Sequence, residues 1–118
     1  MTNQPYSVRQ QKVSRLLENT FNEFFRLQAA NFDHAMITAT QVWVAKDLKM
    51  CRVYLSIYKP TAHDKEAILA LIQAQNKPIR AYIGNKLGKQ LQFIPELFFR
   101  LDDRLDQMDT IEKLLKSE

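Results

Sequence analysis

Seven basic side chains of this 118-residue chain have a spacing that suits phosphate binding. Phosphate groups are held by cations and backbone N–H groups that face in one direction. Four of the cations accompany a predicted break between two helices, namely Lys77, Arg80, Lys86 and Lys89. Three others recur every third residue near the start of the chain, namely Arg9, Lys12 and Arg15. On a helix, each set either contacts phosphates or forms a solvated polar face.

The expected helix break covers Gln75, Asn76, Lys77 and Pro78. Pro78 lacks an N–H group and disfavours helical angles at Lys77, the residue before it. The helix that follows has Pro78 in its first turn and offers unpaired N–H groups with a partial positive charge. Lys77 and Arg80 flank this helix end, so we expect it to be the place where phosphates approach.

Catalytic chemistry finds little support in this sequence. The two histidines, His34 and His63, each stand beside an aspartate in a polar segment, where exposed surface histidines are expected. No Cys/His cluster has the spacing of metal ligands, and no Gly-Lys-Ser/Thr loop is present, so we expect neither a metal nor a nucleotide cofactor. Cys51 is the only cysteine and is expected to be a buried thiol in a reducing cytoplasm.

The composition is that of one globular domain, with 46% apolar and 25% charged residues. No apolar run is long enough to cross a bilayer, and the first residues lack the apolar stretch of a secretory signal. The net charge of +4 is uneven, because residues 1–101 carry +7 and residues 102–118 carry −3. A basic body of this kind favours contact with a polyanion such as nucleic acid, although it also serves solubility.

Hydrophobic periodicity predicts the elements that position these side chains. Residues from Ser7 to about Gln28 predict an amphipathic helix that begins with a capping box of Ser7 and Gln10. Two alternating segments around a polar break at residues 46–49 predict a hairpin. Its inner face takes Val42, Val44, Val53, Leu55 and Ile57, and its outer face takes Trp43, Arg52, Tyr54 and Tyr58.

The second half of the chain predicts two helices, a strand and a last helix. Thr61 is the expected N-cap of a helix that ends near Ala74 and turns Ile68, Leu71 and Ile72 inward. After the break, Ile79, Ile83, Leu87 and Leu91 line one side of the next helix, which Gly88 weakens or ends. Residues 93–101 predict a third strand, with Pro95 at its start or at an edge, that returns parallel to one of the first two. Asp102 or Asp103 is expected to cap the last helix.

The resulting order, α-β-β-α-kink-α-β with a C-terminal helix, is that of a type II K-homology-like domain. Four short motifs resemble those of the ribosome-binding factor A family: Val42-x-Val44-x-x-Asp47-Leu48, Val53-Tyr54-x-Ser56, Ile79-Arg80, and Pro95-Glu96-Leu97-x-Phe99-x-x-Asp102. Two positions depart from the family pattern. Gln75-Asn76-Lys77 replaces the Ala-x-Gly of the kink, and Gln92 stands where the family favours arginine.

The resemblance implies an α+β fold with a three-stranded mixed sheet and helices on one face. The sequence predicts a flexible N-terminus over residues 1–6 and a K-homology-like RNA-binding domain over 7–101. It also predicts a C-terminal helix over 102–118 that either packs on the domain or extends from it. The resemblance further implies a non-enzymatic, monomeric, cytoplasmic factor without membrane contact. Such a factor binds immature small (30S) subunits and precursor 16S rRNA, assists late assembly and 5′-end processing, and supports growth in the cold.

Two other functions remain open from the residues themselves. The domain could be a K-homology-like module for another RNA, although it lacks the Gly-x-x-Gly loop with which such domains hold phosphates. It could also bind a protein through the sheet face away from the helices, where we expect Trp43, Tyr54, Tyr58, Phe98 and Arg100. Aromatic residues on such a face either stack on bases or pair with one another across strands.

Overall fold

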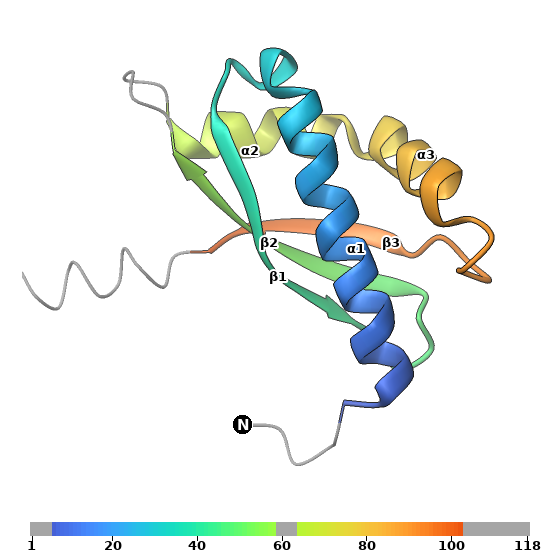
Figure 1. Cartoon of the computed structure of the whole chain (residues 1–118). Helices are drawn as coiled ribbons and strands as arrows, with labels where there is room; N and C mark the ends of the chain where they lie inside the picture. Colours follow the sequence, from blue (N-terminus) through green and yellow to red (C-terminus); the bar gives the residue numbers. More distant parts are fainter. Residues whose placement is uncertain (1–5, 59–63, 103–118) are drawn as a thin grey trace, which may run out of the picture.

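The computed structural model describes residues 6–58 and 64–102, which form one sheet with helices on one face (Figure 1). In chain order the elements are α1 (Val8–Leu27), the 3-10 helix η1 (Ala29–Phe32), β1 (Met36–Val44), β2 (Met50–Tyr58), α2 (Lys65–Ala74), α3 (Asn76–Leu87) and β3 (Glu96–Leu101). The predicted α+β class and element order are confirmed. The predicted C-terminal helix lies outside the described residues from position 103 onward.

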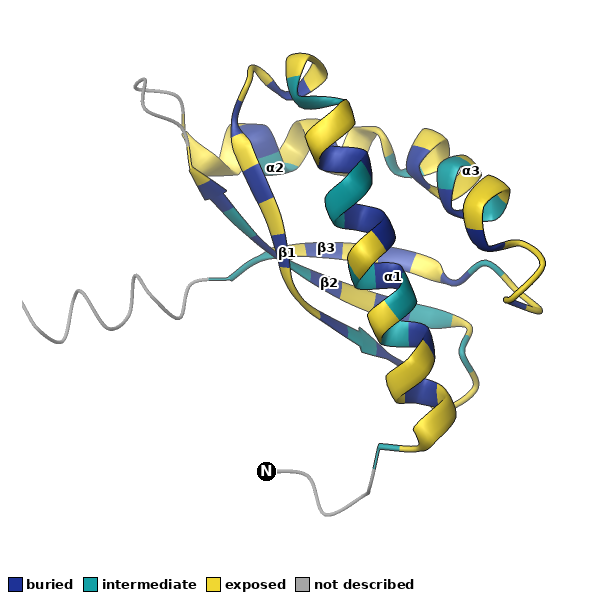
Figure 2. Ribbon diagram, in the orientation of Figure 1, coloured by how far each residue is buried: buried dark blue, intermediate teal, exposed yellow. Residues whose placement is uncertain are grey.

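Helix α1 begins as predicted with a capping box. The Gln10 N–H donates to the Ser7 hydroxyl at 3.0 Å, and the Ser7 N–H donates to Gln10 Oε1 at 2.9 Å. Further along, α1 buries one apolar stripe on the sheet and leaves its basic residues exposed (Figure 2). Tyr6, at the end of the predicted flexible N-terminus, is held by the sheet, because the Val44 N–H donates to its hydroxyl at 2.6 Å.

The hairpin forms with the predicted inner face. All five predicted inward residues of β1 and β2 are buried, and Cys51 is buried with them. The pairing contains one feature that the alternation did not reveal: the register shifts between Ala39 and Gln41, so Thr40 forms a bulge. Both Thr40 and Gln41 are exposed, and the bulge restores the alternation so that Val42 and Val44 face inward.

Helix α2 begins later than predicted. Asp64, not Thr61, is its N-cap, because the Asp64 carboxylate accepts a hydrogen bond from the Glu66 N–H. The prediction that Leu71 faces inward is also wrong, since its side chain is 46% exposed. The helix packs through Ile68 and Ile72, one turn apart, and turns Leu69 toward the core and β3, so Leu71 faces solvent.

The kink lies at Gln75, the single residue between α2 and α3. Its backbone angles, φ −95° and ψ 16°, require neither glycine nor the left-handed region. Lys77 is helical, which contradicts the expectation that Pro78 would push it out of the helix. Pro78 is the third residue of α3, where an N–H group has no partner within the helix, so its ring is tolerated there.

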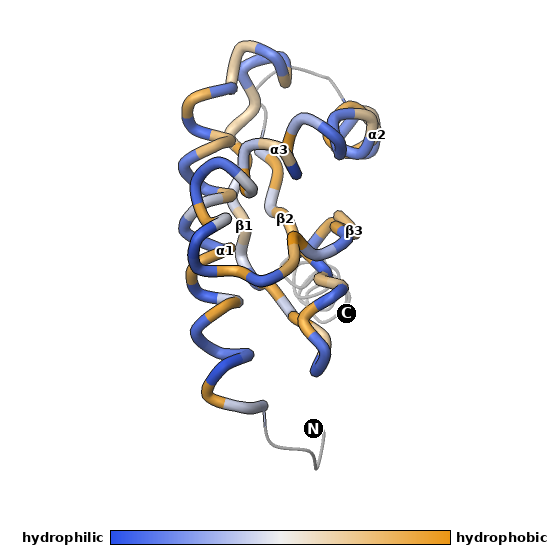
Figure 3. The backbone as a smooth tube through the Cα atoms, turned by 90° about the vertical axis from the view of Figure 1, so that its right-hand side faces the viewer, coloured by the Kyte–Doolittle hydropathy of each residue, from blue (hydrophilic) through white to orange (hydrophobic). Residues whose placement is uncertain are grey.

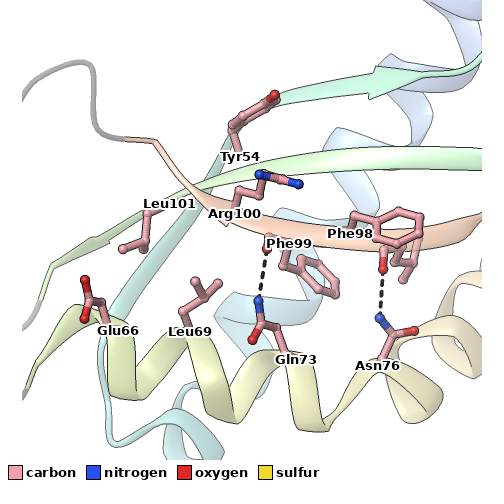
Figure 4. Close-up of a pocket in the computed structure, with 10 residues that line it drawn as sticks. Tyr54, Glu66, Leu69, Gln73, Asn76, Phe98, Phe99, Arg100 and Leu101 are labelled. Carbon is pink, nitrogen blue, oxygen red and sulfur yellow. Dashed lines mark hydrogen bonds between the residues drawn. The ribbon is translucent and has the colours of Figure 1, made fainter.

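Two side-chain amides tie the kink to the outer edge of β3. Asn76 Nδ2 donates to the Leu97 carbonyl at 2.9 Å, and Gln73 Nε2 donates to the Phe99 carbonyl at 3.3 Å (Figure 4). These amides border a groove of about 910 Å³ between α2 and β3. They satisfy carbonyl groups on an edge strand that would otherwise be open to another strand.

The sheet order is β1-β2-β3, with β1 antiparallel and β3 parallel to β2. The strand β3 starts at Glu96, later than predicted, and Pro95 precedes it because a proline cannot donate to the ladder. Figure 3 shows α1 as a layer beside the strands. Aromatic rings fill the space between these layers, with edge contacts among Phe21, Phe25, Phe99 and their neighbours Phe24, Phe32 and Tyr82.

Candidate nucleic-acid interface

The fold gathers five exposed cations at one end of the molecule. Three come from the first half of α1 and two from the turn between β1 and β2, namely Arg9, Lys12, Arg15, Lys46 and Lys49. We call these five residues the basic end. The turn reaches the loop before β3, because the Glu96 N–H donates to the Lys49 carbonyl at 2.9 Å.

Two surface hollows connect four members of the basic end, all except Lys49. One, of about 680 Å³, is lined by Arg9, Lys12 and Arg15 together with Gln90 from the loop after α3. The other, of about 340 Å³, joins Arg9 to Lys46 and to the loop over residues 91–95. Several cations that line neighbouring hollows can contact several phosphates of one folded RNA.

Lys46 and Lys49 are not among the predicted phosphate contacts. The local pattern predicts only a polar break between two strands, and nothing in it places that turn beside the first helix. In the structure, Asp47 belongs to the turn, since its carboxylate accepts a hydrogen bond from the Lys49 N–H at 3.1 Å. Lys49 Nζ also lies 5.6 Å from the centre of the Phe93 ring, a half-exposed aromatic side chain of the neighbouring loop.

The four cations predicted around α3 do not form one row. Arg80 donates to two backbone carbonyls before β3, with Nε at 3.2 Å from Pro95 O and Nη2 at 2.8 Å from Ile94 O. Lys86 faces α1 instead, where its Nζ forms an ion pair with Glu23 Oε1 at 3.0 Å. Lys77 and Lys89 are exposed at the two ends of the helix. As RNA contacts, all four stay predictions, and two of them already have a structural partner.

A small polar network explains the position of Lys86. The Tyr82 hydroxyl donates a hydrogen bond to the Glu23 carboxylate, and the same carboxylate forms an ion pair with Lys86. The hydrogen bond from Tyr82, and then that from Lys86, hold the pKa of Glu23 below its ordinary value. The pKa of Lys86 is raised chiefly by its hydrogen bond to Glu23, so this pair is charged at neutral pH and joins α3 to α1.

The N-terminus of α3 keeps one feature of the predicted phosphate site. Gln75, its N-cap residue, forms no side-chain capping hydrogen bond among the described residues, and Lys77 is exposed beside it. An uncapped N-terminus carries a partial positive charge and unpaired N–H groups. The predicted kink residues Gln75, Asn76 and Pro78 lie together here, but the side-chain amide of Asn76 donates its hydrogen bond to β3.

The groups that could support catalysis are dispersed. His34 is exposed in a left-handed backbone conformation, and His63 lies outside the described residues. Among the residues that the structure describes, no three His, Cys, Asp or Glu side chains are placed to share a metal ion. Burial raises the pKa of the Cys51 thiol to about 12, so this side chain is a neutral part of the core.

No helix in the described ranges, 6–58 and 64–102, is long and apolar enough to span a membrane.

The sheet face away from the helices carries the predicted aromatic set. Strand pairing aligns Trp43, Arg52 and Phe98 in one row and Gln41, Tyr54 and Arg100 in the next. The Arg52 guanidinium lies 5.0 Å from the centre of the Trp43 ring, so these two side chains form a cation–π contact with each other. Phe98 remains 43% exposed. We call this surface the open face.

Comparisons with known proteins agree with this geometry. A family model described as "Ribosome-binding factor A" matches residues 9–115. The ribosome-binding factor A of Cytophaga hutchinsonii is 37% identical over 92% of this chain and 81% of that relative. That of Chlorobaculum tepidum is 35% identical over 94% of this chain and 91% of the relative. The chain belongs to the ribosome-binding factor A family.

Solved structures agree at the level of the fold. The crystal structure of ribosome-binding factor A from Thermus thermophilus matches with a TM-score of 0.65 at 16% identity. The match covers 78% of this chain and 94% of that one. At this identity the likeness supports the type II K-homology-like architecture of the family, with its kinked helix pair and three-stranded sheet.

The motifs that carried the family resemblance are mostly structural in this member. Val42, Val44, Val53, Leu97 and Phe99 are buried in the core. Outside the core, Asp47 shapes the hairpin turn. The exposed cations of the basic end do not belong to these motifs, so the motifs bear on the fold and not on a contact surface.

Proposed function

We propose that this family member binds the immature small ribosomal subunit by contacting precursor 16S rRNA through the basic end. Family membership supports a role in ribosome maturation, because the relatives are named for ribosome binding. The observation that carries the choice of surface is that Arg9, Lys12, Arg15 and Lys46 line two hollows that share Arg9. Lys49 is exposed in the same turn as Lys46. Lys77, beside the uncapped start of α3, is proposed as a separate phosphate contact.

The proposed action is to hold RNA rather than to cut or modify it. A surface of long, exposed cations contacts phosphates without reading base edges, so it suits a folded transcript recognised by shape. We propose that binding favours the mature arrangement of the 5′ region of the RNA and supports processing there, with the protein acting as a cytoplasmic monomer. Slow rearrangement of misfolded RNA helices would make this help most important in the cold.

The first prediction tests the basic end with a matched pair of charge reversals on one helix. Lys12→Glu lies within the basic end, whereas Arg26→Glu lies in the last turn of α1 at the other end. Because a reversed charge repels the phosphates that Lys12 would contact, we expect Lys12→Glu to weaken binding to purified immature small subunits by about tenfold at physiological salt. Arg26→Glu should bind nearly as the natural protein does. Co-sedimentation measures both.

Equal binding by the two variants would exclude the basic end as the contact surface. An unrelated structured RNA serves as the specificity control in the same assay. If the natural protein binds it as tightly as the immature subunit, the domain is a general RNA-binding module and the proposed target is wrong. Circular dichroism of each variant checks that the exposed substitutions leave the fold intact.

A further inference from the structure

The described chain ends on the open face of the sheet. After β3, the Asp102 N–H donates to the Leu55 carbonyl at 2.7 Å. The Asp102 carboxylate accepts a hydrogen bond from the Thr40 hydroxyl at 2.5 Å. Thr40 belongs to β1 and Asp102 follows β3, so this contact crosses the central strand β2. The bulge at Thr40 thus anchors the chain where the next segment, residues 103–118, must begin.

The open face next to this anchor has a definite chemistry. The rows nearest to Asp102 hold Tyr54 with Arg100, then Trp43 with Arg52 and Phe98. They combine three aromatic rings with two guanidinium groups, and described helices cover only the opposite face of the sheet (Figure 1). A suitable partner needs an apolar stripe and negative charge.

Residues 103–118 have both properties. They carry five Asp+Glu and three Lys+Arg, and their apolar residues recur at helical spacing as Leu105, Met108, Ile111 and Leu115. On a helical projection Asp109 and Glu118 border that stripe, while Glu112 and Arg104 fall within it. Sixteen helical residues span about 24 Å, which fits along strands of nine residues that are about 30 Å long. The family match also extends through this segment to residue 115.

We propose that residues 103–118 dock as an amphipathic helix on the open face of the same chain. The apolar stripe covers Trp43, Tyr54 and Phe98, and the bordering carboxylates lie near Arg52 and Arg100. This contact shields the aromatic residues and neutralises the two arginines. The positive charge that stays exposed then lies on the helical side and at the basic end. The proposal does not depend on which RNA, if any, the protein binds.

Trp43 is the only tryptophan of the chain, so its fluorescence reports directly on the open face. In the full chain, Met108→Asp with Ile111→Asp places two charges in the apolar stripe. We expect acrylamide quenching of Trp43 to rise at least about twofold, with a red shift of its emission, because the indole loses its apolar cover. Thr110→Asp with Ser117→Asp adds the same charge on the other side of the helix and should leave both signals unchanged.

Quenching that is unchanged in the first variant, or changed equally in the control, would overturn the proposal. Two other occupants have their own signatures, and each would also overturn it. Protection of Trp43 that is lost on dilution of the natural protein indicates a second copy. Protection that arises only when RNA is added indicates nucleic acid.

A distance measurement gives a second test that does not rely on disrupting the contact. A spin label on Thr110→Cys in the full chain, with Cys51 buried and unlabelled, should broaden the indole N–H resonance of Trp43 at low protein concentration. The label sits on the outer side of the proposed helix and does not interrupt the apolar stripe. An indole resonance that keeps its full intensity would exclude docking.

Discussion

Arg80 illustrates how a cation beside a helix N-terminus can serve the fold. Its guanidinium donates hydrogen bonds to two backbone carbonyl oxygens, Ile94 O and Pro95 O. Both belong to the segment before β3 and lie outside the strand ladder. Backbone carbonyls near the core need partners, and a planar fork of N–H donors can satisfy two at once. A charge reversal at Arg80 therefore tests folding as well as binding, which is why Lys12 and Lys77 are better probes of RNA contact.

Cys51 gives a prediction at the scale of a single group. The folded thiol has a pKa of about 12, whereas an unfolded thiol ionises near pH 8.5. The thiol's contribution to stability is therefore complete below about pH 8.5 and is lost as pH rises toward 12, by about 1.4 kcal/mol per pH unit between these values. We expect Cys51→Ala to be less stable at pH 7 because of its cavity, but less sensitive to alkali.

Urea denaturation of both proteins between pH 7 and pH 10.5 measures this difference. The stability gap between them should narrow as pH rises above about 8.5. A constant gap would show that the thiol titrates normally in the folded state. As an independent check, the natural protein should react with a thiol reagent at pH 8 only after denaturant is added.

Residue types indicate which side chains could bind phosphate, but not which of them already form hydrogen bonds or ion pairs within the protein. Lys86 and Lys89 have the same appearance in the sequence, yet Lys86 meets Glu23, which lies 63 positions earlier. Such partners depend on how α1 and α3 cross, and this crossing is not encoded in any local pattern. Lys46 was overlooked for the same reason, since its neighbours at the basic end come from α1 and from the loop before β3.

At the scale of elements, the kink between α2 and α3 shows how a glycine can be replaced. Gln75 turns the chain without left-handed angles, and the turn is held from outside by the amides of Gln73 and Asn76 on β3. The sequence predicted a break here and placed Pro78 in the first turn of the helix after it, and both predictions are confirmed, but Lys77 is helical although it precedes the proline. Helix propensity located the boundary between α2 and α3 to within a few residues. The hydrogen bonds from Gln73 and Asn76 to β3 fix where that boundary lies.

Asn76→Ala tests this external clamp. Removing the amide leaves the Leu97 carbonyl without its side-chain donor, so we expect a loss of about 1–3 kcal/mol of unfolding free energy. Asn85→Ala, an exposed position on the same helix, is the matched control and should change stability by less than about 0.5 kcal/mol. Chemical denaturation compares them. Equal effects of the two substitutions would show that the bond to β3 does not stabilise the protein, because alanine by itself favours a helix at both positions.

The two glycines near the end of α3 should respond in opposite ways to the same substitution. A Cβ on Gly84 would meet Ile94 Cγ1 at 3.8 Å, an ordinary contact, so Gly84→Ala should stabilise the helix by about 0.5–1 kcal/mol. A Cβ on Gly88 would lie 2.4 Å from the Gly84 carbonyl oxygen, so Gly88→Ala should destabilise the protein by about 1–3 kcal/mol. Thermal unfolding of both variants tests the pair, and shifts of the same sign would contradict it.

At the scale of the whole molecule, charge and burial distinguish two chemically different sides of the described surface. The helical side carries the basic end, and the open face holds aromatic residues with two arginines. Alternation in the strands and periodicity in the helices were enough to predict this two-layer arrangement and the direction of β3. The bulge at Thr40 was not predictable, because one additional residue in a strand leaves no distinct mark in a polar, exposed stretch.

The salt dependence of binding tests whether the basic end acts as one surface. Each phosphate that a cation neutralises releases counterions, so the slope of log K against log salt counts these contacts. We expect Lys12→Glu with Lys46→Glu to make that slope shallower by about two units, because each residue contributes about one. Filter binding to the immature subunit across a salt series measures it, with Arg26→Glu as the control that keeps the natural slope. A double variant that binds weakly but retains the full slope would show that these lysines support the fold and do not contact phosphate.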